Sequence, residues 1–378
     1  MTTRPLVALD IGSTKVACAV GVPHEHTPGF ELLGSSIVPY PSCQDAWLSD
    51  PLLVGHAIEQ ALEAAAVRED LHQALVAINH PSLKAEQVRT AITLGDEPVV
   101  VRAHDVERLQ RAALHQALGV DREPLLVERL GCAGNGFDRV RDPRGLSATR
   151  LTGAFHIVTM PMAARRALVQ AVESAGLEVG RLLYTLPAVL ASVADPELSR
   201  QRVLLVDVGG LSVDIGLFVD GVLQALSVLP WGGLTLATAI ASDAQVTMEQ
   251  AVTWSLEGTA CRRPEARALI ERRWAELPGA AAGLLTDQPR PDRVLVSGRG
   301  GLMDGFVEWI EQATEVPAAL CRSARTGTVG DLSRQIGLSA ALGLLELMSV
   351  KGSRPAAKPD RLVDRLIART RSVLTEYF

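Results

Sequence analysis

The sequence predicts an α/β protein of two lobes, each built on a copy of the same unit. Two stretches carry this prediction, LVALDIGSTKVACAV at residues 6–20 and LLVDVGGLSVDIGLFV at residues 204–219. Each is a β-rich run ending in Asp, a glycine turn and a second β-rich run, a pattern typical of a β-hairpin with N–H groups at its tip. Because the copies lie about 200 residues apart, we expect each to begin its own α/β half, with both tips facing a cleft.

Length and composition limit the classes of protein that fit. The 378 residues are enough for two or three domains at about 100–200 residues each. No stretch approaches the ~20 uninterrupted apolar residues of a membrane span, and no secretory signal is visible, so we expect a soluble body in the cytoplasm. The net charge of −6 disfavours nucleic-acid binding. Cysteines occur singly and in odd number, which argues against a disulfide framework or a zinc site; they are Cys18, Cys43, Cys132, Cys261 and Cys321.

The first hairpin has the composition of a phosphate-binding loop. Asp10 precedes Gly12, Ser13, Thr14 and Lys15. Small turn residues let N–H and hydroxyl groups approach phosphate oxygens, lysine adds positive charge, and an Asp at a strand end can hold Mg²⁺ through water. Taken alone, the same residues also suit an ordinary hairpin in which Asp and Gly only shape the turn.

Two later loops strengthen the prediction of a phosphate site. The second hairpin supplies Asp207 with a glycine turn, and a third glycine cluster follows the predicted strand RVLVSG. A Walker lysine motif and a G-x-G-x-x-G fingerprint are both absent, which disfavours those nucleotide folds. The residues added by these loops are Asp207, Gly209, Gly210, Ser212, Gly298, Gly300 and Gly301.

The C-terminal segment has the pattern of a basic amphipathic helix behind a polar linker. On a helical wheel, the apolar residues of 360–378 fall in one arc of roughly 160°, with arginines beside it. Such a helix suits a membrane interface with anionic headgroups, although it could instead dock on its own body or on a partner. The predicted membrane-binding residues are Leu362, Val363, Arg365, Leu366, Ile367, Arg369, Val373, Leu374, Tyr377 and Phe378.

The order of these motifs resembles the superfamily of actin, hexokinase and the 70-kDa heat-shock chaperones. Within it, LDIGSTKVACAVG, DPRGLSATRL with FHIVT, ALVQAVESAGLEVGRL, LLVDVGGLSVDIGLFVDGVLQALSVLPWGG and VLVSGRGGLMDGF resemble the bacterial cell-division family FtsA over residues 6 to about 348. The resemblance implies an actin-like, ribonuclease H-like duplicated fold with an inserted α+β subdomain 1C and a reduced subdomain 2B. The implied boundaries are 1–80, 158–182 and 328–348 for 1A, 81–157 for 1C, 183–236 and 291–327 for 2A, 237–290 for 2B, 349–359 for the linker and 360–378 for the membrane helix.

The sequence departs from that family at the predicted nucleotide site. Leu211 and Ser212 stand where the family has glycine and threonine, and a branched side chain disfavours positive φ and crowds a phosphate. Arg299 replaces a glycine expected near the adenosine. In the family, a helix after the second hairpin contacts the nucleotide through a Glu and a Lys. Here Glu249 is available for the first position, but Thr253 or Trp254 stands where the lysine is expected. No acidic or amide side chain in PAVLASVA could orient a water, so we expect little or no hydrolysis.

These observations predict an actin-like, membrane-tethered adaptor of bacterial division. The resemblance implies ATP or ADP with Mg²⁺ as cofactor, with Asp10 and Asp207 facing the metal through water, and the departures leave open whether this cofactor has been lost. It also implies the FtsZ C-terminal peptide, the anionic membrane surface, further copies of the chain in filaments or oligomers, and other division proteins at 1C as partners. The expected location is the cytoplasmic face of the cell membrane at the division site. The alternatives are a PilM-like scaffold of a pilus or secretion machine, and a sugar or acetate kinase of the superfamily.

Overall fold

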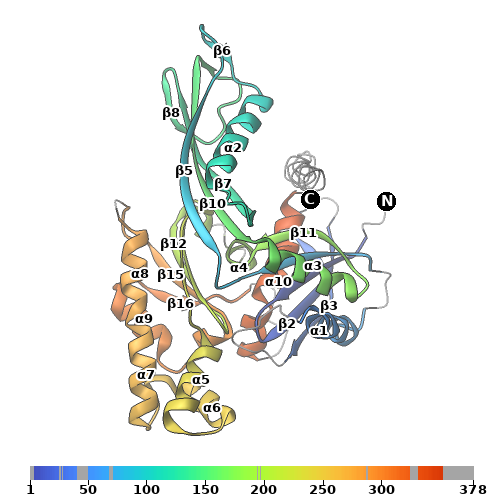
Figure 1. Cartoon of the computed structure of the whole chain (residues 1–378), viewed down its shortest axis with the longest axis vertical. Helices are drawn as coiled ribbons and strands as arrows, with labels where there is room; N and C mark the ends of the chain where they lie inside the picture. Colours follow the sequence, from blue (N-terminus) through green and yellow to red (C-terminus); the bar gives the residue numbers. More distant parts are fainter. Residues whose placement is uncertain are drawn as a thin grey trace.

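The computed structural model describes residues 4–24, 27, 29–40, 50–67, 71–193, 195, 197–286, 288–323 and 331–351. In this part of the chain, two five-stranded sheets form two lobes, and an inserted domain projects away from them (Figure 1). The predicted membrane-binding segment 360–378 and most of its linker lie outside the described residues.

The first lobe is built on a sheet of order β11-β4-β1-β2-β3. The strands β1, β2 and β3 form an antiparallel meander, whereas β4 and β11 continue from β1 in parallel. Helix α1 packs against α3, and α10 packs against α4, beside this sheet. The elements are β1 (Leu6–Ile11), β2 (Lys15–Pro23), β3 (Phe30–Pro39), β4 (Gln73–Ile78), β11 (Glu178–Tyr184), α1 (Pro51–Ala64), α3 (Met162–Ser174), α4 (Thr185–Val193) and α10 (Leu332–Lys351).

The second lobe repeats the scheme of the first sheet strand for strand. Its order is β14-β13-β12-β15-β16, with an antiparallel meander and two parallel strands continuing from β12. The two-lobed, duplicated α/β fold predicted from the paired hairpins is therefore confirmed. The strands are β12 (Arg202–Val208), β13 (Val213–Val219), β14 (Val222–Leu229), β15 (Arg293–Ser297) and β16 (Ala318–Leu320), and the short helix η1 (Leu198–Arg200) precedes them.

Helices fill the part of the second lobe between β14 and β15. No described residue between 233 and 292 belongs to a strand, which agrees with the predicted reduction of this region. Trp274 of α7 is fully buried against Phe306 of α9, with ring centroids 5.1 Å apart. The helices are α5 (Gly233–Ala244), α6 (Met248–Glu257), η2 (Gly258–Ala260), α7 (Pro264–Trp274), α8 (Glu276–Leu284), η3 (Arg299–Leu302) and α9 (Phe306–Thr314).

The inserted domain has a sheet and a hydrophobic core of its own. Its sheet has the order β5-β10-β7-β8, and α2 packs on β5 and β10 over a core that includes Leu109, Leu151 and Phe155. The helix of this domain is α2 (Ala103–Ala117). The strands are β5 (Lys84–Thr93), β6 (Val99–Val100), β7 (Arg122–Gly134), β8 (Phe137–Val140), β9 (Ser147–Ala148) and β10 (Arg150–Pro161).

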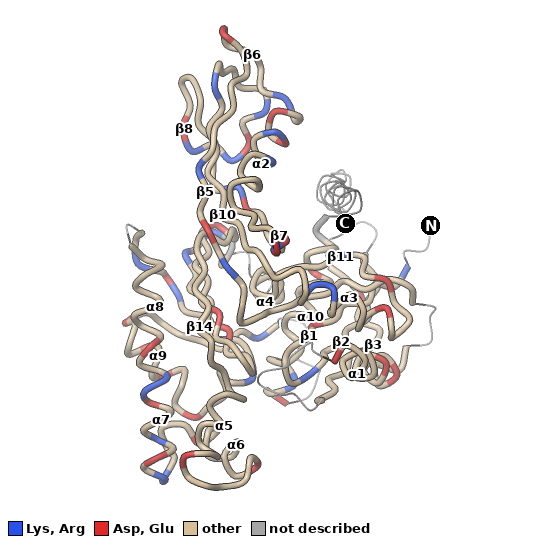
Figure 2. The backbone as a smooth tube through the Cα atoms, in the orientation of Figure 1, with Lys and Arg blue, Asp and Glu red and all other residues tan. Residues whose placement is uncertain are grey.

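Both α2 and α7 carry charges of both signs (Figure 2). The last helix, α10, extends to Lys351, three residues beyond the boundary predicted from the sequence. Among the described residues, no helix is both long and apolar enough to cross a membrane.

Candidate functional site

The tips of the two hairpins have the same turn. The Gly12 N–H donates to the carbonyl of Lys15 at 3.0 Å, and the Gly209 N–H donates to the carbonyl of Ser212 at 3.0 Å. The tips also lie against each other, because a Cβ atom added to Gly210 would come within 2.5 Å of Ser13 Oγ. Glycine at 210 is therefore required by this close approach.

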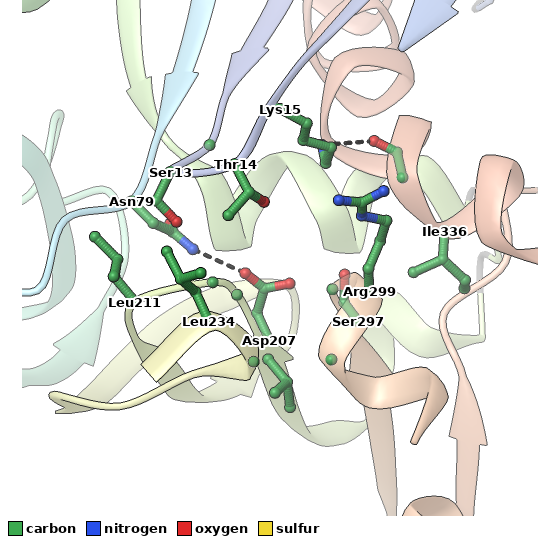
Figure 3. A pocket seen from close by; sticks show the side chains of 18 of the residues that line it. Ser13, Thr14, Lys15, Asn79, Asp207, Leu211, Leu234, Ser297, Arg299 and Ile336 are labelled. Atoms are coloured by element: carbon green, nitrogen blue, oxygen red, sulfur yellow. Dashed lines mark hydrogen bonds between the residues drawn. The ribbon is translucent and has the colours of Figure 1, made fainter. Parts of the chain in front are cut away.

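A pocket of about 360 Å³ lies beside the paired tips. Parts of both lobes line it, together with the loop after β15 and one side of α10 (Figure 3). Eleven of the thirteen residues predicted to bind a nucleotide are on its wall: Asp10, Gly12, Ser13, Thr14, Lys15, Asp207, Gly209, Gly210, Ser212, Gly298 and Gly300.

Glu249 and Gly301 do not line the pocket. Glu249 is exposed in the first turn of α6, which presents Val252 and Leu256 to the pocket instead. Gly301 is buried and packs toward Val296 of β15, where a Cβ atom would come within 2.5 Å of that side chain. The structure thus places these two predicted residues outside the pocket wall, because neither the rotation of the helix nor the direction of the loop could be fixed from the sequence.

Asp10 and Lys15 face each other across the first hairpin. Lys15 Nζ lies 2.6 Å from Asp10 Oδ2 and also donates to the carbonyl of Gly337 in α10 at 2.9 Å. The lysine expected to face phosphates thus bridges the first hairpin to the last helix.

Asp207 is buried at the end of β12 and receives donors from two other strand ends. Asn79, directly after β4, donates from Nδ2 to Asp207 Oδ2 at 2.8 Å, and Ser297 ends β15 beside it. Burial and the nearby Asp10 raise the pKa of Asp207 to about 6, while hydrogen bonds from Ser297 and Asn79 and the charge of Lys15 oppose this rise. Asn79 and Ser297 were missed in the sequence, although both stand where parallel strands end at one sheet edge.

Leu211 is buried at the second hairpin tip and lines the pocket. It does not adopt a left-handed backbone conformation, so the expected conflict with positive φ does not occur. The side chain nevertheless occupies pocket wall beside Ser13 and Asn79 (Figure 3).

Arg299 begins η3 and extends from the loop after β15 into the pocket, toward the side where Lys15 lies (Figure 3). Partial burial lowers the pKa of its guanidinium, which nonetheless keeps its charge, because arginine stays protonated in proteins. With Asp10, Asp207 and Lys15 it completes the charged residues that line the pocket among those described.

Two duplicated lobes, paired hairpin tips and a pocket between them define a protein of the actin-like class. Solved structures agree: the PilM–PilN type IV pilus biogenesis complex matches with a TM-score of 0.67 at 15% identity, over 93% of this chain and 99% of that one. The ethanolamine utilization protein EutJ from Carboxydothermus hydrogenoformans matches with a TM-score of 0.53 at 13% identity, over 92% and 90%.

The resemblance to the cell-division protein FtsA is also confirmed. Residues 81–159 match the family described as the SHS2 domain inserted in FtsA. FtsA of Pseudomonas aeruginosa is 28% identical over 247 residues, which are 63% of this chain and 57% of that protein. FtsA of Borreliella burgdorferi is 22% identical over 376 residues and 91% of each chain. The match thus spans little more than half of the Pseudomonas relative.

Proposed function

We propose that this chain is an actin-like adaptor of the bacterial cell-division machinery, which links FtsZ-type filaments to the cytoplasmic face of the membrane at the division site. The observation that carries the proposal is the match of residues 81–159 to the SHS2 domain of FtsA, within a duplicated α/β core. This role needs three kinds of partner. They are further copies of the chain, an FtsZ tail peptide on the helical part of the second lobe, and further division proteins on the insert.

The pocket is suited to a nucleotide held as a structural ligand. The phosphates of the nucleotide would face the hairpin tips, where Ser13 and Thr14 stand. The base would face the end of the pocket that is lined by apolar side chains of α6. There Val252 and Leu256 of α6 line the wall and are 41% and 47% exposed. An aromatic base would cover these side chains, and covering apolar surface is favourable by about 25 cal/mol per Å².

The membrane step of the proposal rests on the sequence of 360–378. The test is co-sedimentation of the full chain with liposomes that contain anionic lipid. We expect Leu366→Asp with Ile367→Asp to abolish binding, because both residues lie in the apolar arc. Ala368→Asp with Ser372→Asp adds the same charge on the opposite side of the wheel and should weaken binding far less. Undiminished binding of the first double variant contradicts the tether.

A PilM-like scaffold is the second candidate, favoured by the TM-score of 0.67 over 93% of this chain. Such a scaffold would bind a membrane protein's peptide and would not need an amphipathic anchor. The same liposome experiment separates the two, since a scaffold predicts no dependence on the apolar arc. The kinase alternative gains no support, because the carboxylates on the described pocket wall, Asp10 and Asp207, are both engaged by protein donors.

A further inference from the structure

The pocket contains a cation, Arg299, whose side chain forms no ion pair with another described residue. The Arg299 side chain has no hydrogen bond or ion pair within the described part of the chain, and burial alone accounts for the lowered pKa of its guanidinium. Its side chain nevertheless points into the pocket (Figure 3). An unpaired guanidinium held in a concave site is well suited to an anion, because its planar fork matches two phosphate oxygens at once.

The carboxylates expected to hold magnesium are committed to protein donors. Asp10 Oδ2 accepts from Lys15 Nζ at 2.6 Å, and Asp207 Oδ2 accepts from Asn79 Nδ2 at 2.8 Å. Magnesium requires near-ideal octahedral oxygen ligation and is usually held by carboxylates and water. These pairings, with a guanidinium reaching into the same pocket, do not fit a magnesium ion held between Asp10 and Asp207.

The charges on the described wall of the pocket cancel. Asp10 and Lys15 form one pair of opposite charges, and Asp207 and Arg299 supply the other two. An incoming phosphate group would add negative charge. Of the two cations, Lys15 is already paired, whereas Arg299 can contact a ligand without breaking an existing bond.

We propose that Arg299 takes the place of a divalent cation, so that the pocket binds a nucleoside diphosphate without metal. This inference rests on the proposed nucleotide pocket. It adds that the guanidinium of Arg299 balances the negative charge of the phosphates. Lys15, on the first hairpin, is the second positive charge on the pocket wall. It keeps its hydrogen bond to the carbonyl of Gly337 in α10.

The test is a titration of the full chain with a fluorescent ADP analogue, once with excess EDTA and once with excess magnesium chloride. We expect the two dissociation constants to agree within about twofold. Arg299→Gln should weaken binding about tenfold or more in EDTA, the range for losing a hydrogen bond to a charged group. Arg293→Gln, at the opposite end of β15 and outside the pocket, is the matched control and should leave affinity unchanged.

Each outcome separates the inference from the proposed function. Binding that occurs only with magnesium overturns metal-independent binding and leaves the nucleotide pocket standing. No binding in either buffer overturns the nucleotide pocket itself. An Arg299→Gln variant with unchanged affinity overturns the role of Arg299. If that variant fails to fold, as judged by circular dichroism, the comparison of the two buffers with the natural chain still decides whether binding needs a metal.

Discussion

The hydroxyl of Tyr184 donates a hydrogen bond to Asp214 Oδ2 at 2.7 Å, and this bond joins β11 of the first sheet to β13 of the second hairpin. Both side chains are fully buried. The bond therefore connects the two lobes through the interior, close to the candidate site, because Asp214 stands opposite Asp207 in the β12–β13 register.

Replacing Tyr184 with Phe should destabilise the chain more at alkaline than at acidic pH. Burial raises the pKa of Asp214 to about 7, and the Tyr184 hydrogen bond opposes this rise. Because the folded pKa lies above the unfolded one, this carboxyl contributes stability at low pH that is lost as pH rises through about 7. Without the bond, the pKa should rise further. We expect a loss of about 1–3 kcal/mol at pH 8 and a smaller loss at pH 6, measured by urea unfolding. An equal loss at both pH values would contradict this coupling.

His156 on β10 predicts a pH effect of the opposite sign. It is 2% exposed, and burial lowers its pKa to about 4. Neither ring nitrogen has a hydrogen-bond partner among the described residues. Since the unfolded state binds the proton first, stability falls as pH drops from about 6.5 towards 4, by up to about 3 kcal/mol.

The variant His156→Leu removes this dependence. The difference in unfolding free energy between variant and natural chain should move in favour of the variant by about 3 kcal/mol between pH 7 and pH 4. Urea unfolding across that range measures it. Contributions from Asp207 and Asp214 cancel in the difference, because both proteins contain them. A difference that stays constant with pH would refute the assignment to His156.

Two helical glycines should respond to alanine in opposite directions. A Cβ atom on Gly343 of α10 would lie 1.7 Å from the carbonyl oxygen of Ala188 in α4, whereas Gly279 of α8 has nothing within 4 Å. Gly343→Ala should cost about 1–3 kcal/mol or more through overpacking. Gly279→Ala should add about 0.5–1 kcal/mol, since alanine is the better helix former. Thermal unfolding of both variants tests this, and a neutral Gly343→Ala would show that α4 and α10 do not pack this closely.

The fold was predictable from sequence because its duplicated unit is local. Each hairpin is encoded within about 16 residues, so Asp10 and Asp207 could be placed at matching positions without knowing any long-range contact. The pocket wall was predictable to the same extent, because most of it is made by those two tips and the loop after β15.

Long-range pairings at the site could not be predicted in this way. The bond from Lys15 to the carbonyl of Gly337 spans 322 residues, and that from Asn79 to Asp207 spans 128. The misplacement of Glu249 has a different origin, since a rotation of one residue along α6 changes which side chains meet the pocket. The pattern of polar and apolar residues in α6 does not reveal that rotation, because Val252 and Leu256 are apolar and yet exposed on the pocket wall.

ATP turnover by the full chain should be negligible. Efficient phosphoryl transfer needs a group that orients the attacking water or hydroxyl. The carboxylate and amide side chains on the described pocket wall are Asp10, Asp207 and Asn79, and all three are bonded to each other or to Lys15. Leu211 adds an apolar side chain to the pocket wall. We expect phosphate release well below about 1 per second, the lower end of the range for kinases, and Leu211→Gly should not raise it, because the orienting group would still be missing. Release at several per second from the natural chain, measured with purified protein and ATP with magnesium, would show that a described or undescribed residue supplies that group and that the pocket is a working catalytic site.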